Sequence, residues 1–188
     1  YTAETLFPYT TLFRSNLTIY CHKNNVDIIN TISSLLLDKK FTKYIGTRIL
    51  FNEIYDKCTV SILDWNINFF DIRSTKELQF GFNTTLRNGK SLAFLGDEPY
   101  NDELFEYANK VDYLFHEAFC LYSQKDIFKP YEKHHATVKD ACENASKLNV
   151  KNIVLFHTED KNILNRRKLY TDEGKQFFAG NIIVPDDL

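Results

Sequence analysis

Titratable side chains follow apolar, strand-like segments at several points in the C-terminal half of the sequence. Asp97 comes directly after the run Leu-Ala-Phe-Leu-Gly, and His116-Glu117 closes the run Asp-Tyr-Leu-Phe. His157 follows Asn-Ile-Val-Leu-Phe, and His135 stands just before a helical pattern. Residues at the ends of apolar strands are where α/β folds place their sites. Carboxylate and imidazole groups together can bind a metal such as zinc, so this set predicts a metal site.

Each of these residues also has a structural alternative. Asp97 could close a turn, because Gly, Asp and Pro are all turn residues. His116 could be a core histidine whose ring nitrogens are satisfied, and Glu117 could be a surface carboxylate. His135 could lie in a solvated loop, and His157 could belong to a helix cap. Each fragment alone is a weak signal, and only their order and contexts together favour function.

Alternating strand and helix patterns must position these residues. Apolar or β-prone runs predict strands over residues 16–20, 48–54, 59–63, 66–72, 79–86, 91–95, 111–115, 151–156 and 181–184. Helical spacing predicts helices within residues 24–37, over 102–109, after Thr137 and within 161–175. Asn88-Gly89 between two apolar runs predicts a β-hairpin, and Thr137 with Asp140 forms a capping-box pattern. The chain is therefore expected to form a sheet-based α/β fold with helices on its outer faces.

Composition excludes several other classes of protein. The 188 residues carry 23 Lys+Arg and 25 Asp+Glu, a formal net charge of −2, and 44% are hydrophobic. This balance excludes a strongly basic nucleic-acid coat and an acidic disordered tail. No apolar run is long enough to span a bilayer, so no membrane partner is expected. The four cysteines form no C-x-x-C pair, which predicts no metal knuckle and fits a reducing, cytoplasmic compartment.

The motifs resemble, in their order, those of the metallo-β-lactamase fold and of its ribonuclease Z-like branch. The resemblance covers nearly everything after Asn16 and is best over residues 79–188. The matching segments are Gly96-Asp97, His116-Glu117-Ala118-Phe119 where the family has H-E-A-T, His135-Ala136-Thr137 where it has H-S-T, and Leu155-Phe156-His157. The segments F-L-G-D-E-P-Y and H-E-A-F also resemble bacterial ribonuclease Z-like hydrolases of unassigned substrate.

This resemblance implies a role for each residue. Asp97 and His157 would ligate zinc, one or two ions in a full-length parent, with Mn²⁺ as an alternative. A hydroxide on the metal would attack phosphorus or a carbonyl carbon, because zinc lowers the pKa of bound water to about 7. His135 would stabilise or protonate the leaving oxygen. Glu117 would orient His135 or His116 through a hydrogen bond, so these three residues form the expected catalytic group.

The start of the sequence has its own explanation. Methionine is absent, the chain begins at Tyr1, and Thr5 to Ser15 read TLFPYTTLFRS, which resembles a translated sequencing-library adaptor. We therefore expect residues 1–15 to be a non-native segment. Residues 16–188 would be the major C-terminal part of a single metallo-β-lactamase-like domain, an αββα sandwich that is incomplete at its N-terminus. The alternative is a genuine N-terminal strand, because TLF and TTLF are β-prone.

Two departures from the family concern the metal. The primary motif H-x-H-x-D-H is absent from the sequence, and Ser74–Gln79, where ribonuclease Z enzymes place another ligand histidine, contains none. Catalytic zinc usually has three protein ligands and a water. We therefore expect the 188-residue chain to bind zinc weakly and to be catalytically inactive, while its full-length parent would be a hydrolase.

Two classes of function stay open from the sequence. The first is a fragment of a zinc-dependent hydrolase that cleaves a phosphodiester, RNA included, or an ester. The second is a non-catalytic dimerisation or binding module on the same fold, for which a homodimer is one form. Retention of Asp97, Glu117, His135 and His157 favours the first, and the missing histidine near Thr75 favours the second.

Overall fold

The computed structural model describes residues 16–186. The expectation that residues 1–15 are non-native lies outside the described residues. The chain divides into two compact units, one up to Tyr55 and one from Asp56 onward, and each is described by itself. The expectation of one domain over residues 16–188 stays a prediction.

The unit up to Tyr55 pairs two strands in parallel. Strand β1 (Leu17–Cys21) runs beside β2 (Ile49–Glu53), with Leu17 opposite Ile49. Parallel neighbours need a crossover connection. Helices α2 (Lys23–Leu36) and α3 (Lys39–Thr42) supply it. The helical spacing within residues 24–37 predicts α2, whereas α3 was not predicted.

The unit from Asp56 onward begins with antiparallel strands. They are β3 (Thr59–Ile62), β4 (Trp65–Asp71), β5 (Phe80–Thr85) and β6 (Ser91–Phe94), each paired with the next. The predicted hairpin joins β5 to β6. Leu86 N–H donates to the Lys90 carbonyl at 2.8 Å, and Gly89 takes the left-handed φ of +78° that favours glycine in such a turn.

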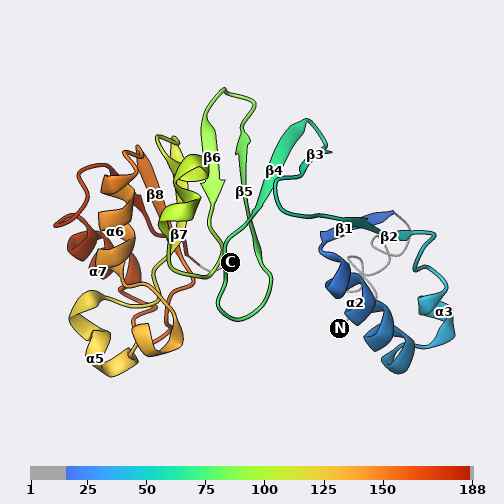
Figure 1. Ribbon diagram of the computed structural model, residues 1–188. Coiled ribbons are helices and arrows are strands. Elements are labelled where there is room, and N and C mark those ends of the chain that lie inside the picture. Colours follow the sequence, from blue (N-terminus) through green and yellow to red (C-terminus); the bar gives the residue numbers. More distant parts are fainter. Residues whose placement is uncertain (1–15, 187–188) are drawn as a thin grey trace, which may run out of the picture. The chain divides into compact units, whose positions relative to one another are not determined.

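The sheet then continues with parallel strands. Strand β7 (Tyr113–Glu117) lies beside β6, β8 (Asn152–Phe156) beside β7, and β9 (Asn181–Ile183) beside β8, giving seven strands in the order β3 to β9. The carboxyl ends of β6, β7 and β8 therefore meet at one edge of the sheet (Figure 1). The α/β fold expected from the sequence is confirmed.

Short helical turns and two longer helices connect the parallel strands. They are η2 (Asp102–Leu104), α4 (Phe105–Ala108), η3 (Tyr122–Gln124), α5 (Lys125–Phe128), η4 (Tyr131–Lys133), α6 (Val138–Lys147) and α7 (Arg166–Gly174). Helix α6 begins with the predicted capping box, in which Thr137 and Asp140 bond reciprocally. It packs against β7 and β8, and α7 packs against β9 and α6 (Figure 1).

The core lies between the parallel strands and these helices. Its largest fully buried side chains include Tyr170, Phe70, Leu114, Leu148, Ile153 and Leu155. The charged stretch predicted as a helix from about residue 161 starts later, at Arg166. Residues 161–165 form turns instead of helix. The buried Glu159 carboxylate accepts hydrogen bonds from the Lys161 N–H and from the Asn162 side-chain amide, which favours these turns. None of the helices in residues 16–186 is long and apolar enough to cross a lipid bilayer.

Candidate active site

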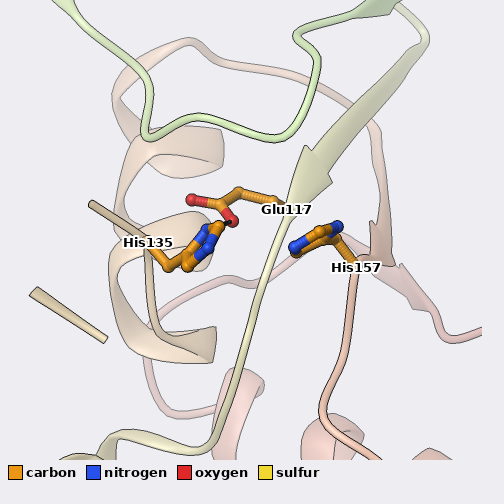
Figure 2. A group of neighbouring side chains, drawn as sticks. All are labelled: Glu117, His135 and His157. Atoms are coloured by element: carbon orange, nitrogen blue, oxygen red, sulfur yellow. Dashed lines mark hydrogen bonds and ion pairs between the residues drawn. The ribbon is translucent and has the colours of Figure 1, made fainter. Parts of the chain in front are cut away.

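Three side chains converge where β7 and β8 end. Glu117 is the last residue of β7, His157 follows β8, and His135 comes from the loop before α6. One potential ligand atom of each lies within 4.8 Å of those of the other two. Figure 2 shows the carboxylate of Glu117 turned toward the ring of His135, with His157 beside them. Three residues singled out from the sequence are therefore brought together.

Glu117 is the buried member of this group. Its side chain is 0% exposed, Oε2 lies 2.7 Å from Nδ1 of His135, and Oε1 accepts the Ala136 N–H at 2.7 Å. Burial raises the pKa of Glu117 to about 8, the Ala136 N–H opposes this rise, and the charges of Asp97 and Glu98 add to it. Both oxygens of Glu117 are thus engaged in holding the segment that carries His135.

His135 lies half-buried between Glu117 and two rings. Burial lowers its pKa, and the nearby His157 and Lys76 lower it further. The Phe119 ring stacks on the His135 ring, with centroids 5.1 Å apart, and the His157 ring centroid is 4.9 Å away. The bond to Glu117 uses Nδ1, so Nε2 is the ring nitrogen that His135 has left for another partner.

Hydrogen bonds between loops hold these positions. Phe119 N–H donates to the Ala136 carbonyl at 2.9 Å, which ties the end of β7 to the His135 segment. The Phe119 carbonyl accepts from the Glu159 N–H at 2.8 Å and from the Tyr170 hydroxyl at 3.0 Å, which ties the same point to the segment after β8. The loops that carry Glu117, His135 and His157 therefore form one bonded framework.

His157 is the exposed member of the group. Its φ is +55°, a left-handed conformation that is uncommon for residues other than glycine and costs backbone energy. The residue after it is anchored, because Thr158 Oγ1 accepts a hydrogen bond from the buried Arg166 at 2.7 Å. The His157 imidazole is therefore accessible to solvent beside the buried Glu117 carboxylate.

Asp97 lies after β6 and is half-buried. It is not one of the three clustered residues, but its charge acts on both Glu117 and His135. Gly96 takes φ +75°, and a Cβ there would lie 2.7 Å from Ile72. Any other residue at position 96 would force the Ile72 side chain to move. Packing, as well as the site, therefore explains the Gly96-Asp97 pair.

His116 is placed differently from the other predicted residues. Successive strand residues face opposite sides of a sheet, so His116 turns away from Glu117. Its ring is fully buried, with Nδ1 2.7 Å from the Glu117 carbonyl and Nε2 3.2 Å from the Asn144 amide. The structure does not bring it into the group. Its geometry fits the core alternative, and a catalytic role for His116 stays a prediction.

The buried His116 makes stability depend on pH. Burial lowers its pKa from 6.5 to about 4. Between these values the unfolded chain binds a proton that the folded chain does not, so the free energy of unfolding should fall by roughly 2–3 kcal/mol as pH drops through this window. Other groups also titrate in this window, so the test compares two proteins by urea unfolding in EDTA at pH 7 and 4.5. The change in stability from pH 7 to pH 4.5 should be more favourable in His116→Gln than in the wild type by roughly 2–3 kcal/mol. The same change in both proteins would contradict the assignment.

Sequence reasoning missed two charged residues beside the group. Glu98 is 5% exposed, and its Oε1 accepts the Ser74 hydroxyl at 2.9 Å and lies 3.7 Å from Lys76 Nζ. Lys76 acts electrostatically on both Glu117 and His135. The sequence held one indication of Lys76, because it lies in Ser74–Gln79, the segment in which ribonuclease Z enzymes carry a ligand histidine that this chain lacks. No local pattern pairs it with Glu98.

The donors at this edge fit a zinc ion by type. Imidazole and carboxylate are ordinary zinc ligands. Glu117 has both carboxylate oxygens hydrogen-bonded, one with His135 and one with the Ala136 N–H. Asp97 and the exposed His157 carry donor atoms that take no part in those two hydrogen bonds. The group therefore offers a partial donor set for a metal together with a carboxylate–imidazole pair.

Comparison with known proteins gives sequence relatives over about half of the chain. Ribonuclease Z of Prochlorococcus marinus (strain NATL1A) is 30% identical over 105 residues, which are 54% of this chain and 33% of that protein. Ribonuclease Z of Archaeoglobus fulgidus is 31% identical over 102 residues, 53% of this chain and 32% of that protein. The match thus spans about a third of the length of these relatives. No protein-family model matches the sequence.

Solved structures share the fold over most of the chain. The metallo-beta-lactamase fold protein YhfI from Bacillus subtilis matches with a TM-score of 0.69 and 15% identity, over 91% of this chain and 63% of that one. The short form of human tRNase Z matches with a TM-score of 0.63 and 18% identity, over 95% and 68%. At this identity the likeness shows the fold, and the fold class predicted from the sequence is confirmed.

Proposed function

We propose that this chain, which has the metallo-β-lactamase fold and resembles ribonuclease Z, carries part of the active site of a metal-dependent hydrolase. Its substrate would be a phosphodiester, RNA included, or an ester. The observation that supports this is the 2.7 Å bond between Glu117 and His135 beside the exposed His157, at the carboxyl edge of parallel strands.

In this proposal the residues divide the work. Asp97 and His157 would hold the metal, one or two zinc ions in the parent protein, with Mn²⁺ as an alternative. A bound zinc ion would supply Lewis acidity and a water activated near neutral pH. His135 would stabilise or protonate the leaving oxygen through Nε2, the nitrogen that Glu117 does not engage. Glu117 acts on the substrate only through His135 and is a positioning residue.

The finer proposal is that the 188-residue chain is inactive by itself. Asp97 and His157 are two protein ligands, whereas catalytic zinc usually has three. The sequence has no H-x-H-x-D-H string that would add more, and the ribonuclease Z relatives are about three times as long as the matched segment. Activity would then belong to a longer parent, and a cytoplasmic location is part of the same proposal.

A hydrolysis assay tests this division. With bis(p-nitrophenyl) phosphate and added Zn²⁺ or Mn²⁺, the 188-residue chain should release nitrophenol no faster than the metal alone. A parent protein with the H-x-H-x-D-H motif should turn over, and His135→Gln in it should lower kcat about 10²–10⁴-fold, as expected for a general acid. Turnover by the short chain, or full activity of the His135→Gln parent, would refute the assignment.

A non-catalytic dimerisation or binding module is the second candidate. The observation that favours it is Lys76, whose ammonium lies beside the group and opposes a bound cation. If this is the function, the parent would lack the H-x-H-x-D-H motif and would sediment as a dimer without metal. Sedimentation of the parent in EDTA, together with its sequence, separates the two candidates.

A further inference from the structure

Lys76 and Glu98 form a charged pair beside the candidate active site to which the proposed function gives no task. Lys76 lies in the loop between β4 and β5, and Glu98 follows Asp97 after β6. Strands β4 and β6 both run antiparallel to β5, so their carboxyl ends share one edge of the sheet. Strands β7 and β8 run parallel to β6 and end at the same edge. The pair therefore belongs to the edge that carries Glu117 and His157.

Hydrogen bonds fasten the Lys76 loop to the loop after β6. Ser74 Oγ donates to Glu98 Oε1 at 2.9 Å and accepts the Lys76 N–H at 3.2 Å. At the start of the same loop, the Ile72 carbonyl accepts a hydrogen bond from the Asn101 side-chain amide at 3.0 Å. The backbone that carries Lys76 is therefore held in place, and its Nζ lies 3.7 Å from Glu98 Oε1.

The carboxylate that faces Lys76 is more buried than the partners of the other paired lysines. Among the lysine ion pairs within residues 16–186, the Glu98 side chain is 6% exposed, and Asp112, the partner of Lys151, follows at 17%. Exposed ion pairs contribute little to stability, whereas a buried charge that loses its partner is costly. The Lys76–Glu98 pair is therefore expected to persist in the folded chain.

The positive charge of Lys76 acts on the residues of the candidate active site. Three carboxyl groups gather at this edge, and the charges of Asp97 and Glu98 raise the pKa of Glu117. Lys76 acts on the Glu117 pKa in the opposite direction, and it lowers the pKa of His135. A metal ion at this edge would have the same sign of effect on both groups. Lys76 also comes from the segment in which the family's ligand histidine is missing.

We propose that Lys76 supplies the charge of a second metal ion, so that the site takes a single metal at Asp97 and His157. The ammonium group would remain on Glu98 while that metal binds. Its repulsion would lower the affinity for the metal, and dissolved salt would screen part of that repulsion. This inference rests on the proposed function, because it takes Asp97 and His157 as the metal ligands.

Calorimetric zinc titration of the metal-free 188-residue chain tests this role by the sign of the change. Lys76→Gln removes the repulsion and should tighten zinc binding about three- to tenfold at low salt. The gain should shrink at high salt. Lys76→Arg keeps the charge and should stay within about twofold of the wild type. A purely structural role would give the opposite sign, because a loosened loop would weaken zinc binding.

Lys151→Gln is the matched control. It also removes a lysine that is paired with a partly buried carboxylate, that of Asp112, but this pair lies at the opposite end of β7 from Glu117. The control has the same net charge as Lys76→Gln. Its zinc affinity should change less than about twofold, because the lost charge is far from the metal and screened.

Urea unfolding in EDTA tests the pair without metal. Lys76→Gln should lower the urea midpoint, because the buried Glu98 carboxylate loses its partner, and Lys76→Arg should restore the midpoint. In a Glu98→Gln background the same replacement of Lys76 should have little effect. An equal fall of the midpoint in both backgrounds would show that Lys76 acts through packing, which would overturn the inference.

The zinc titration separates this inference from the proposed function. Zinc affinity that is unchanged or weaker in Lys76→Gln would overturn the role of Lys76, and so would undetectable binding in both proteins. Tightening in Lys76→Arg, or more than one zinc ion on the wild-type chain, would also overturn it. Zinc binding that depends on His157 but not on Lys76 would leave the metal centre intact. Binding that survives His157→Asn would instead contradict the metal centre itself.

Discussion

Replacing Glu117 by alanine should lower the free energy of unfolding by about 3–5 kcal/mol, because it leaves two hydrogen-bonding groups without their partner, at about 1–3 kcal/mol each, and removes a buried side chain. The carboxylate is 0% exposed, and both of its oxygens are bonded at 2.7 Å. Its loss leaves the Ala136 N–H and His135 Nδ1 without their partner and opens a cavity. Urea unfolding at pH 6 in EDTA measures the change.

Glu117→Gln is the matched control, because it keeps the volume and an oxygen that can accept the Ala136 N–H. It should retain most of the stability that Glu117→Ala loses. If alanine and glutamine variants both unfold like the wild type, the bonded framework around His135 is not as described.

The pH profile gives an independent check on the same residue. Burial raises the pKa of Glu117 from 4.5 to about 8. As pH rises between these values, the unfolded chain loses a proton that the folded chain keeps, so stability contributed by the neutral carboxyl is present below pH 4.5 and is lost toward pH 8. Glu117→Gln should remove this decline. The direction is opposite to that of His116, so the two substitutions separate the two contributions.

Replacing His157 by asparagine should weaken zinc binding by more than about a hundredfold, since loss of a supporting partner alone typically costs about 10–100-fold. Asparagine tolerates the left-handed φ of +55° at this position, so the imidazole is removed without new backbone strain. His134→Asn is the matched control. His134 also has a left-handed φ, of +57°, and is exposed, but it is not one of the clustered residues. Zinc affinity should be unchanged in the control.

The sequence predicted the elements well where local signals decide them. The hairpin at Asn88-Gly89 and the capping box at Thr137 are set by turn and cap chemistry within a few residues. The late start of α7 was not predicted, because it depends on side-chain hydrogen bonds from Glu159 that compete with the helix. The division at Tyr55 also has no linker-like composition to signal it.

The candidate site was predicted in part for the same reason. Strand ends placed Glu117 and His157 correctly at one edge, because parallel strands share the direction in which they end. Adjacent residues of a strand cannot both face the site, and His116 turns to the opposite side from Glu117, where its ring meets Asn144 of α6. The approach of Lys76 to Glu98 joins two separate loops and could only be found in three dimensions.

Zinc titration of the metal-free 188-residue chain by calorimetry tests the central claim most directly. We expect weak binding that is lost in both His157→Asn and Asp97→Asn and kept in His134→Asn. Binding of equal strength in all four proteins would contradict a metal centre at Asp97 and His157, and so would tight stoichiometric zinc that survives the loss of His157.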